Sequence, residues 1–209
     1  LTHTSGFAAW RPFYLLVDER SEILSEILRT PLRDDGDVVY SDLNFLVLTF
    51  IIERLLDERI DEAAKTLIFA PLGLGDTYYD PPIDLRARIA ASEKGNEYER
   101  QTCIELGFRT PHSALRSHAI WGEVHDGNAH FMGGVAGHAG LFGTAADVLE
   151  IAKQFLPGST ELLQPETCGL FTTNFTSQGS EHRSFAFQLA STPQSTAGTL
   201  MSPQSFGHL

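Results

Sequence analysis

The sequence is poor in positive charge and has no long apolar run. Its 209 residues carry 15 Lys and Arg against 27 Asp and Glu, a formal net charge of -12. An acidic surface repels phosphate backbones and anionic headgroups, so nucleic acid is not an expected partner. The longest strongly apolar stretch, residues 43–52, is interrupted by Asn44 and Thr49 and falls short of the roughly 18 residues that a membrane span needs. We therefore predict no membrane span.

Cysteine is also scarce. Cys103 and Cys168 lie 65 positions apart without a C-x-x-C pair, so neither a zinc motif nor a redox motif is indicated. Two structural thiols are the favoured interpretation, and one disulfide is the alternative. The first residues show no basic segment followed by an apolar one, so no export signal is visible and the compartment is left open.

Two signatures of an activated serine are absent from the sequence. An S-x-x-K helix places a lysine one turn after a serine, where it helps to remove the hydroxyl proton. The residues three places before Lys65, Lys94 and Lys153 are Glu62, Ala91 and Glu150, and these are all the lysines of the chain. A G-x-S-x-G elbow is absent as well. The chain therefore contains neither common arrangement for activating a serine.

Helical periodicity accounts for most of the interpretable pattern. Apolar residues recur at helical spacing over 19–29, 41–58 and 145–155, and Ser41 is a plausible N-cap. Much of 75–130 lacks a clear period and is interpreted as loop. We predict a mainly α chain, an α+β remnant, with a helical domain and long loops over 1–183. A β-like tail is expected over 184–209, with at most a short C-terminal strand or hairpin.

Four short motifs carry the most information. They are H-T-S-G at 3–6, Y-S-D at 40–42, V-H-D-G-N-A at 124–129 followed by G-G-V-A-G-H-A-G-L-F-G-T at 133–144, and F-G-H at 206–208. Together they resemble the interior of serine hydrolases of the class C β-lactamase, penicillin-binding protein and esterase superfamily. The resemblance covers nearly the whole chain and implies the helical domain of the serine β-lactamase/transpeptidase-like fold. The S-x-x-K segment is expected before residue 1, so a truncated internal segment is expected.

The resemblance implies roles for three side chains. Tyr40 would be the general base or proton shuttle, Asp42 the polar group that orients the substrate, and His208 the cation on the substrate side. A phenol needs nearby cations to act as a base at neutral pH. Asp42 stands where the family commonly has Asn, a departure that favours ester or amide hydrolysis over β-lactam hydrolysis. The alternative is structural: Tyr40 as a packed aromatic residue and Asp42 as an acidic residue favoured in a first helical turn.

The remaining site candidates are Ser41, His125, Asp126 and His138. We expect the His and Asp side chains to hold their glycine-rich loop in shape through hydrogen bonds, with a place along the substrate cleft as the alternative. A metal site is disfavoured because no H-E-x-x-H pair sets two ligands on one helical face. No metal or cofactor is therefore predicted.

Two functions of different classes follow. The first is a segment of a β-lactamase-like serine hydrolase, inactive alone, that would meet a small-molecule acyl substrate only when completed by the missing segments. The second is a non-catalytic helical module used for binding or self-association as a homo-oligomer, because faces that once packed on a sheet would be apolar and exposed.

Overall fold

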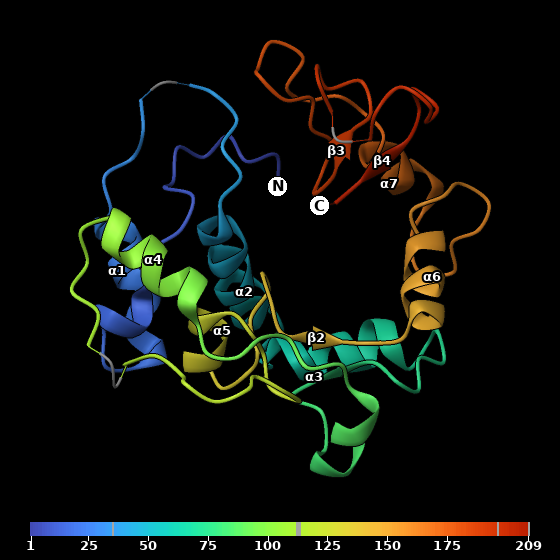
Figure 1. Ribbon diagram of the computed structural model, residues 1–209. Coiled ribbons are helices and arrows are strands. Elements are labelled where there is room, and N and C mark those ends of the chain that lie inside the picture. The colour runs from blue at the N-terminus through green and yellow to red at the C-terminus, as the bar shows by residue number, and fades with distance from the viewer. Residues whose placement is uncertain (35, 112–113, 196, 209) are drawn as a thin grey trace. The chain divides into compact units, whose positions relative to one another are not determined.

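A computed structural model describes residues 1–34, 36–111, 114–195 and 197–208. Among them, seven α-helices and four two-residue strands are present, joined by 3-10 and π turns (Figure 1). The helices are α1 (Ile23–Arg29), α2 (Asp42–Leu56), α3 (Ile60–Ala64), α4 (Glu97–Glu105), α5 (Gly127–Phe131), α6 (Ala145–Lys153) and α7 (Pro165–Leu170). The strands are β1 (Tyr78–Tyr79), β2 (Leu141–Phe142), β3 (Gln188–Leu189) and β4 (Phe206–Gly207). No helix of the described ranges is long and apolar enough to cross a membrane.

The chain forms two units that alternate along the sequence. Unit 1 comprises residues 1–9, 31–44 and 145–209, and unit 2 comprises 10–30 and 45–144. The first turn of α2 belongs to unit 1, and the rest of that helix belongs to unit 2. The sequence analysis expects two continuous parts, 1–183 and 184–209. Each observed unit is made of separate segments, and the division at 183/184 stays a prediction.

The core of unit 2 is built by helices and by one buried amide. Ile23 and Ile27, one turn apart on α1, are fully buried, as i, i+4 spacing requires. The side chain of Asn128 at the start of α5 is also fully buried. Its oxygen accepts from the Phe13 amide at 2.8 Å and its nitrogen donates to the Arg11 carbonyl at 2.8 Å. Both polar ends of this side chain are therefore satisfied, so its burial carries little cost.

The glycine-rich block packs its backbone against α2 within unit 2. The amide of Gly137 donates to the hydroxyl of Thr49 at 2.8 Å, and that hydroxyl donates to the Phe45 carbonyl at 2.7 Å. A Cβ atom at Gly137 would lie 2.5 Å from the Thr49 hydroxyl oxygen. Only glycine permits this approach.

A short antiparallel ladder joins two distant segments of unit 2. Tyr78 pairs with Phe142 and Tyr79 with Leu141. The sequence does not indicate this ladder, because pairing between segments about 60 residues apart leaves no local pattern.

Unit 1 is centred on aromatic side chains. Phe155, which follows α6, contacts Phe171 after α7 at a centroid distance of 4.7 Å and Phe187 at 4.9 Å. Phe187 in turn lies 5.1 Å from Phe206 of β4. The β3–β4 pair, with Leu189 opposite Phe206, is the only pair of named strands in the described part of 184–209, where the sequence predicts at most a short strand or hairpin.

Candidate functional site

The first nine residues position the Y-S-D motif within unit 1. The Val39 amide donates to the His3 carbonyl at 3.0 Å, and the Asp42 amide donates to the Ala9 carbonyl at 2.9 Å. The Ser41 hydroxyl donates to the Ala8 carbonyl at 2.7 Å and is fully buried. These bonds hold the loop that delivers Tyr40 to the start of α2.

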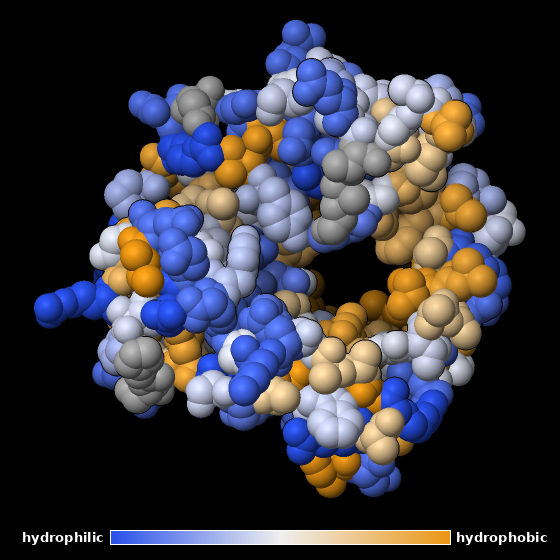
Figure 2. Space-filling model, viewed as in Figure 1, coloured by the Kyte–Doolittle hydropathy of each residue, from blue (hydrophilic) through white to orange (hydrophobic). Residues whose placement is uncertain are grey.

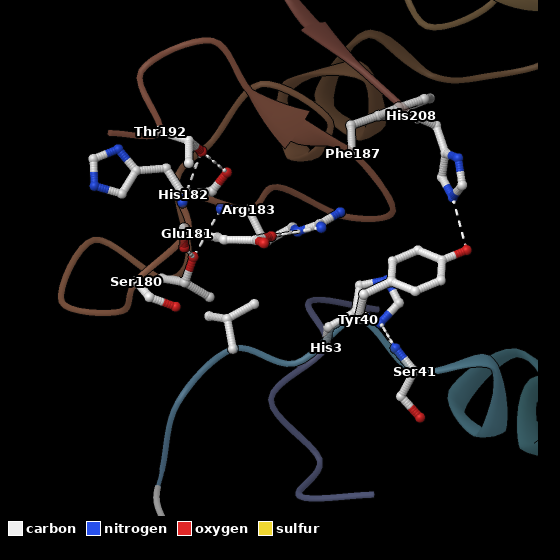
Figure 3. A network of polar contacts seen from close by, with 12 residues as sticks. His3, Tyr40, Ser41, Ser180, Glu181, His182, Arg183, Phe187, Thr192 and His208 are labelled. Carbon is white, nitrogen blue, oxygen red and sulfur yellow. Dashed lines mark hydrogen bonds and ion pairs between the residues drawn. The ribbon is translucent and has the colours of Figure 1, made fainter. Parts of the chain in front are cut away.

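His3 is the main support beneath Tyr40. It is only 2% exposed, and its Nδ1 accepts the Ser41 amide at 3.0 Å with the Asn44 side-chain nitrogen at 3.4 Å. Its ring stacks on the ring of Tyr40 at 4.6 Å (Figure 3). Burial, followed by the positive charge of Arg183, lowers the pKa of His3 from 6.5 to about 4. His3 is therefore a neutral acceptor at neutral pH.

Tyr40 meets His208 although 168 positions separate them. The phenol oxygen lies 3.3 Å from Nε2 of His208, and the rings meet edge to face at 5.6 Å (Figure 3). Tyr40 is 37% exposed and His208, directly after β4, is exposed. Burial and the carboxylate of Asp42 raise the pKa of Tyr40, whereas Arg183 lowers it. The structure thus brings together two of the three predicted catalytic side chains and places the third, Asp42, two residues from Tyr40.

Arg183 belongs to this cluster, and sequence reasoning missed it. It is 5% exposed, and its guanidinium carbon lies 5.8 Å from the centre of the Tyr40 ring. One signal was available: Glu181 and Arg183 stand two positions apart, a spacing that places side chains on one face of an extended segment. In a tail rich in Ser, Thr, Pro and Gly, that signal does not stand out.

The remaining candidates, His125, Asp126 and His138, belong to unit 2. Asp126 caps α5 by accepting the Ala129 amide at 2.7 Å and accepts a second hydrogen bond from Nε2 of His138 at 2.9 Å. Burial alone would raise the pKa of Asp126, but the hydrogen bond and charge of His138 lower it. His125 pairs instead with Glu93 at 2.9 Å. The hydrogen bonds expected of these side chains are present, and a role along a substrate cleft stays a prediction.

A hollow lies beside His208 within unit 1. Its volume is about 180 Å³, and its walls come from the β3–β4 pair and the loop that joins these strands. Side chains that line it include Gln188, Met201, Phe206 and His208. It is a concave surface next to the Tyr40–His208 pair.

Comparison with known proteins covers the whole chain. The Beta-lactamase family model matches residues 1–209. A putative D-alanyl-D-alanine carboxypeptidase of Escherichia coli (strain K12) is 31% identical over 228 residues, which cover 100% of this chain and 50% of that protein. A protein of the same description from Salmonella agona (strain SL483) is 32% identical over 226 residues, with the same coverage. The chain spans about half the length of the curated relatives it matches.

Solved structures show a similar fold. A beta-lactamase/D-alanine carboxypeptidase from Pseudomonas syringae has a TM-score of 0.61 at 16% identity, over 92% of this chain and 47% of that one. A class C beta lactamase from Rhodobacter sphaeroides has a TM-score of 0.59 at 16% identity, over 90% of this chain and 46% of that one. Identities this low show the fold alone.

Proposed function

Because the chain belongs to the beta-lactamase family, we propose that it supplies one part of the acyl-transfer site of a serine hydrolase. The observation that carries the proposal is the 3.3 Å approach of the Tyr40 phenol to His208. These two residues come from separate motifs, Y-S-D and F-G-H, and nothing in a purely structural role requires them to meet at an exposed edge. A tyrosine beside an imidazole provides two side chains that can exchange a proton, which suits general acid–base chemistry.

In the proposed reaction, a serine from a segment outside this chain attacks an ester or peptide-like carbonyl. Tyr40, in its phenolate form, takes the serine proton and becomes the neutral phenol, which later gives that proton to the leaving group. Asp42 orients the substrate, and His208 lies on the substrate side. The neutral His3 stacks beneath Tyr40 and fixes the position of its ring.

The names of the relatives suggest the substrate class. We propose a small peptide-like substrate that ends in D-alanyl-D-alanine, because the E. coli and S. agona proteins are described as putative carboxypeptidases for that dipeptide. The hollow beside His208, at about 180 Å³, offers a concave surface for part of such a substrate.

This chain should be inactive alone, since it has no S-x-x-K. A fluorescent penicillin and a fluorophosphonate probe should leave the 209-residue chain unlabelled, and a longer reading frame that adds an in-frame S-x-x-K should react at that serine. Labelling of any serine of the short chain would refute its inactivity. A longer protein that carries S-x-x-K and resists both probes would refute the hydrolase proposal.

The second candidate is a non-catalytic module that associates with its own copies. Val148 and Leu149 of α6 are 59% and 60% exposed, and apolar surface gathers over α6 at the right of the view (Figure 2). Neighbouring exposed apolar side chains favour self-association. Sedimentation should then show a concentration-dependent oligomer that Val148→Glu disrupts, and a strict monomer at high concentration would exclude it.

A further inference from the structure

Arg183 is a buried cation beside the candidate tyrosine, and no recognised motif accounts for it. Its amide donates to the Thr176 hydroxyl at 2.7 Å, and the same hydroxyl donates to the Glu181 carbonyl at 2.6 Å. These bonds fold the segment 176–183 into a loop that turns the Arg183 side chain toward Tyr40 (Figure 3). The Thr176 hydroxyl therefore holds the backbone of this segment at Glu181 and at Arg183.

Glu181 holds the guanidinium itself. Nε and Nη2 of Arg183 both donate to one carboxylate oxygen of Glu181, at 2.8 and 2.6 Å. The Arg183 side chain of this pair is 7% exposed and the Glu181 side chain 32%. A planar guanidinium that donates through two of its nitrogens to one carboxylate has little freedom to rotate. The cation is thus preorganised before any substrate arrives.

Four groups surround Tyr40 and can carry charge. His3 below the ring is neutral at neutral pH because its pKa is lowered to about 4. Asp42 is negative and opposes formation of a phenolate. His208 contacts the phenol oxygen through a ring nitrogen. A guanidinium carries its charge at any physiological pH, so Arg183 is the permanent cation among the four.

We propose that Arg183, held by Glu181, is a positioning residue that favours the phenolate form of Tyr40. A positive charge over the ring attracts the anion more strongly than it attracts the neutral phenol. Arg183 thereby supplies part of the positive charge that a proton-accepting tyrosine needs. The catalytic meaning of this effect rests on the proposed function, whereas the effect itself can be measured on this chain.

The test is the titration of Tyr40 by NMR in the chain labelled at the Cζ carbon of its five tyrosines, with Tyr40→Phe identifying the signal. Removal of the charge in Arg183→Gln should raise the Tyr40 midpoint by about one pH unit. Arg183→Lys, which keeps the charge, should restore most of the shift. Arg100→Gln is the matched control, because Arg100 also donates twice to a carboxylate, that of Glu97, but lies on α4 in unit 2.

Two outcomes would overturn the inference: equal shifts in the Gln and Lys variants, which indicate packing alone, or no shift in either. If Arg183→Gln does not fold, the Tyr40 titration in Glu181→Gln tests the inference instead. That variant keeps the cation and removes its counter-charge, so the Tyr40 midpoint should fall, and a constant or higher midpoint would refute the inference. Failure of these titrations leaves the labelling test of the hydrolase proposal unaffected, and the converse also holds.

Discussion

Acid should destabilise this protein through His3. The pKa of its imidazole is about 4 in the folded chain, against 6.5 for an exposed histidine. The unfolded state therefore binds the proton more readily between these values. The stabilising contribution is complete above pH 6.5, falls as the pH drops toward 4, and is lost below. The difference between the two pKa values corresponds to roughly 3 kcal/mol of unfolding free energy.

The substitution that isolates this effect is His3→Asn. His3 has a positive φ of 59°, a region that Asn also tolerates. The Asn side-chain oxygen stands close to the place of Nδ1 and can accept the Ser41 amide, but it does not titrate. The variant should lose a little stability at pH 7, because stacking on Tyr40 is weakened, and should then lose about 3 kcal/mol less than the wild type on acidification to pH 4.

Urea unfolding followed by circular dichroism at half-unit steps from pH 7 to pH 4 measures the difference. His182→Asn is the control, because it removes an imidazole that bonds Ser191 in an exposed position and leaves His3 in place. Parallel profiles for the wild type and His3→Asn would show that His3 is not the acid-sensitive group and would refute the reasoning.

Three further outcomes are expected. Gly137→Ala places a Cβ atom 2.5 Å from the Thr49 hydroxyl oxygen, so thermal melting should show a loss of about 1–3 kcal/mol. Asp126→Ala removes the cap of α5 and the acceptor of His138, which should cost about 2 kcal/mol in urea unfolding, with Asn at this position restoring part of it. Tyr40→Phe should leave the melting temperature within about 2 °C yet slow acylation of a complete, S-x-x-K-bearing form about 10²- to 10⁴-fold in stopped-flow assays. A melting temperature much lower than this in the Phe variant would assign Tyr40 a structural role.

The sequence predicts the fold best where one helical face is apolar. The period predicts a helix over 41–58, and α2 runs from Asp42 to Leu56. Over 97–105 the apolar residues do not predict the helix that is present, because the buried face of α4 carries Glu99 beside Cys103. The Glu99 carboxylate is satisfied there by the Gly127 amide at 2.7 Å and the Tyr14 hydroxyl at 3.0 Å, and such partners cannot be inferred from local spacing.

The sequence likewise predicts some residues of the candidate site and not others. Motif resemblance identifies Tyr40 and His208, and the structure places them 3.3 Å apart. Arg183 carries no motif, and only the folded loop 176–183 brings its charge to the Tyr40 ring. The neutral state of the buried His3 likewise depends on the residues around it in the fold and cannot be inferred from the H-T-S-G motif. Electrostatic roles of this kind arise from tertiary contacts, so sequence patterns do not predict them.

The alternation of the two units along the chain governs the order in which they can form. Every segment of unit 2 is complete once residue 144 has left the ribosome, whereas unit 1 is complete only after residues 145–209 have followed. Closing so long a loop is slow, and domains made during synthesis fold as they emerge. The segment that carries Tyr40 can therefore bind the first nine residues early, but Arg183 and His208 reach Tyr40 only after every segment of unit 2 has been made. Until then the Tyr40 ring lacks both contacts and is open to proteases and to chaperones.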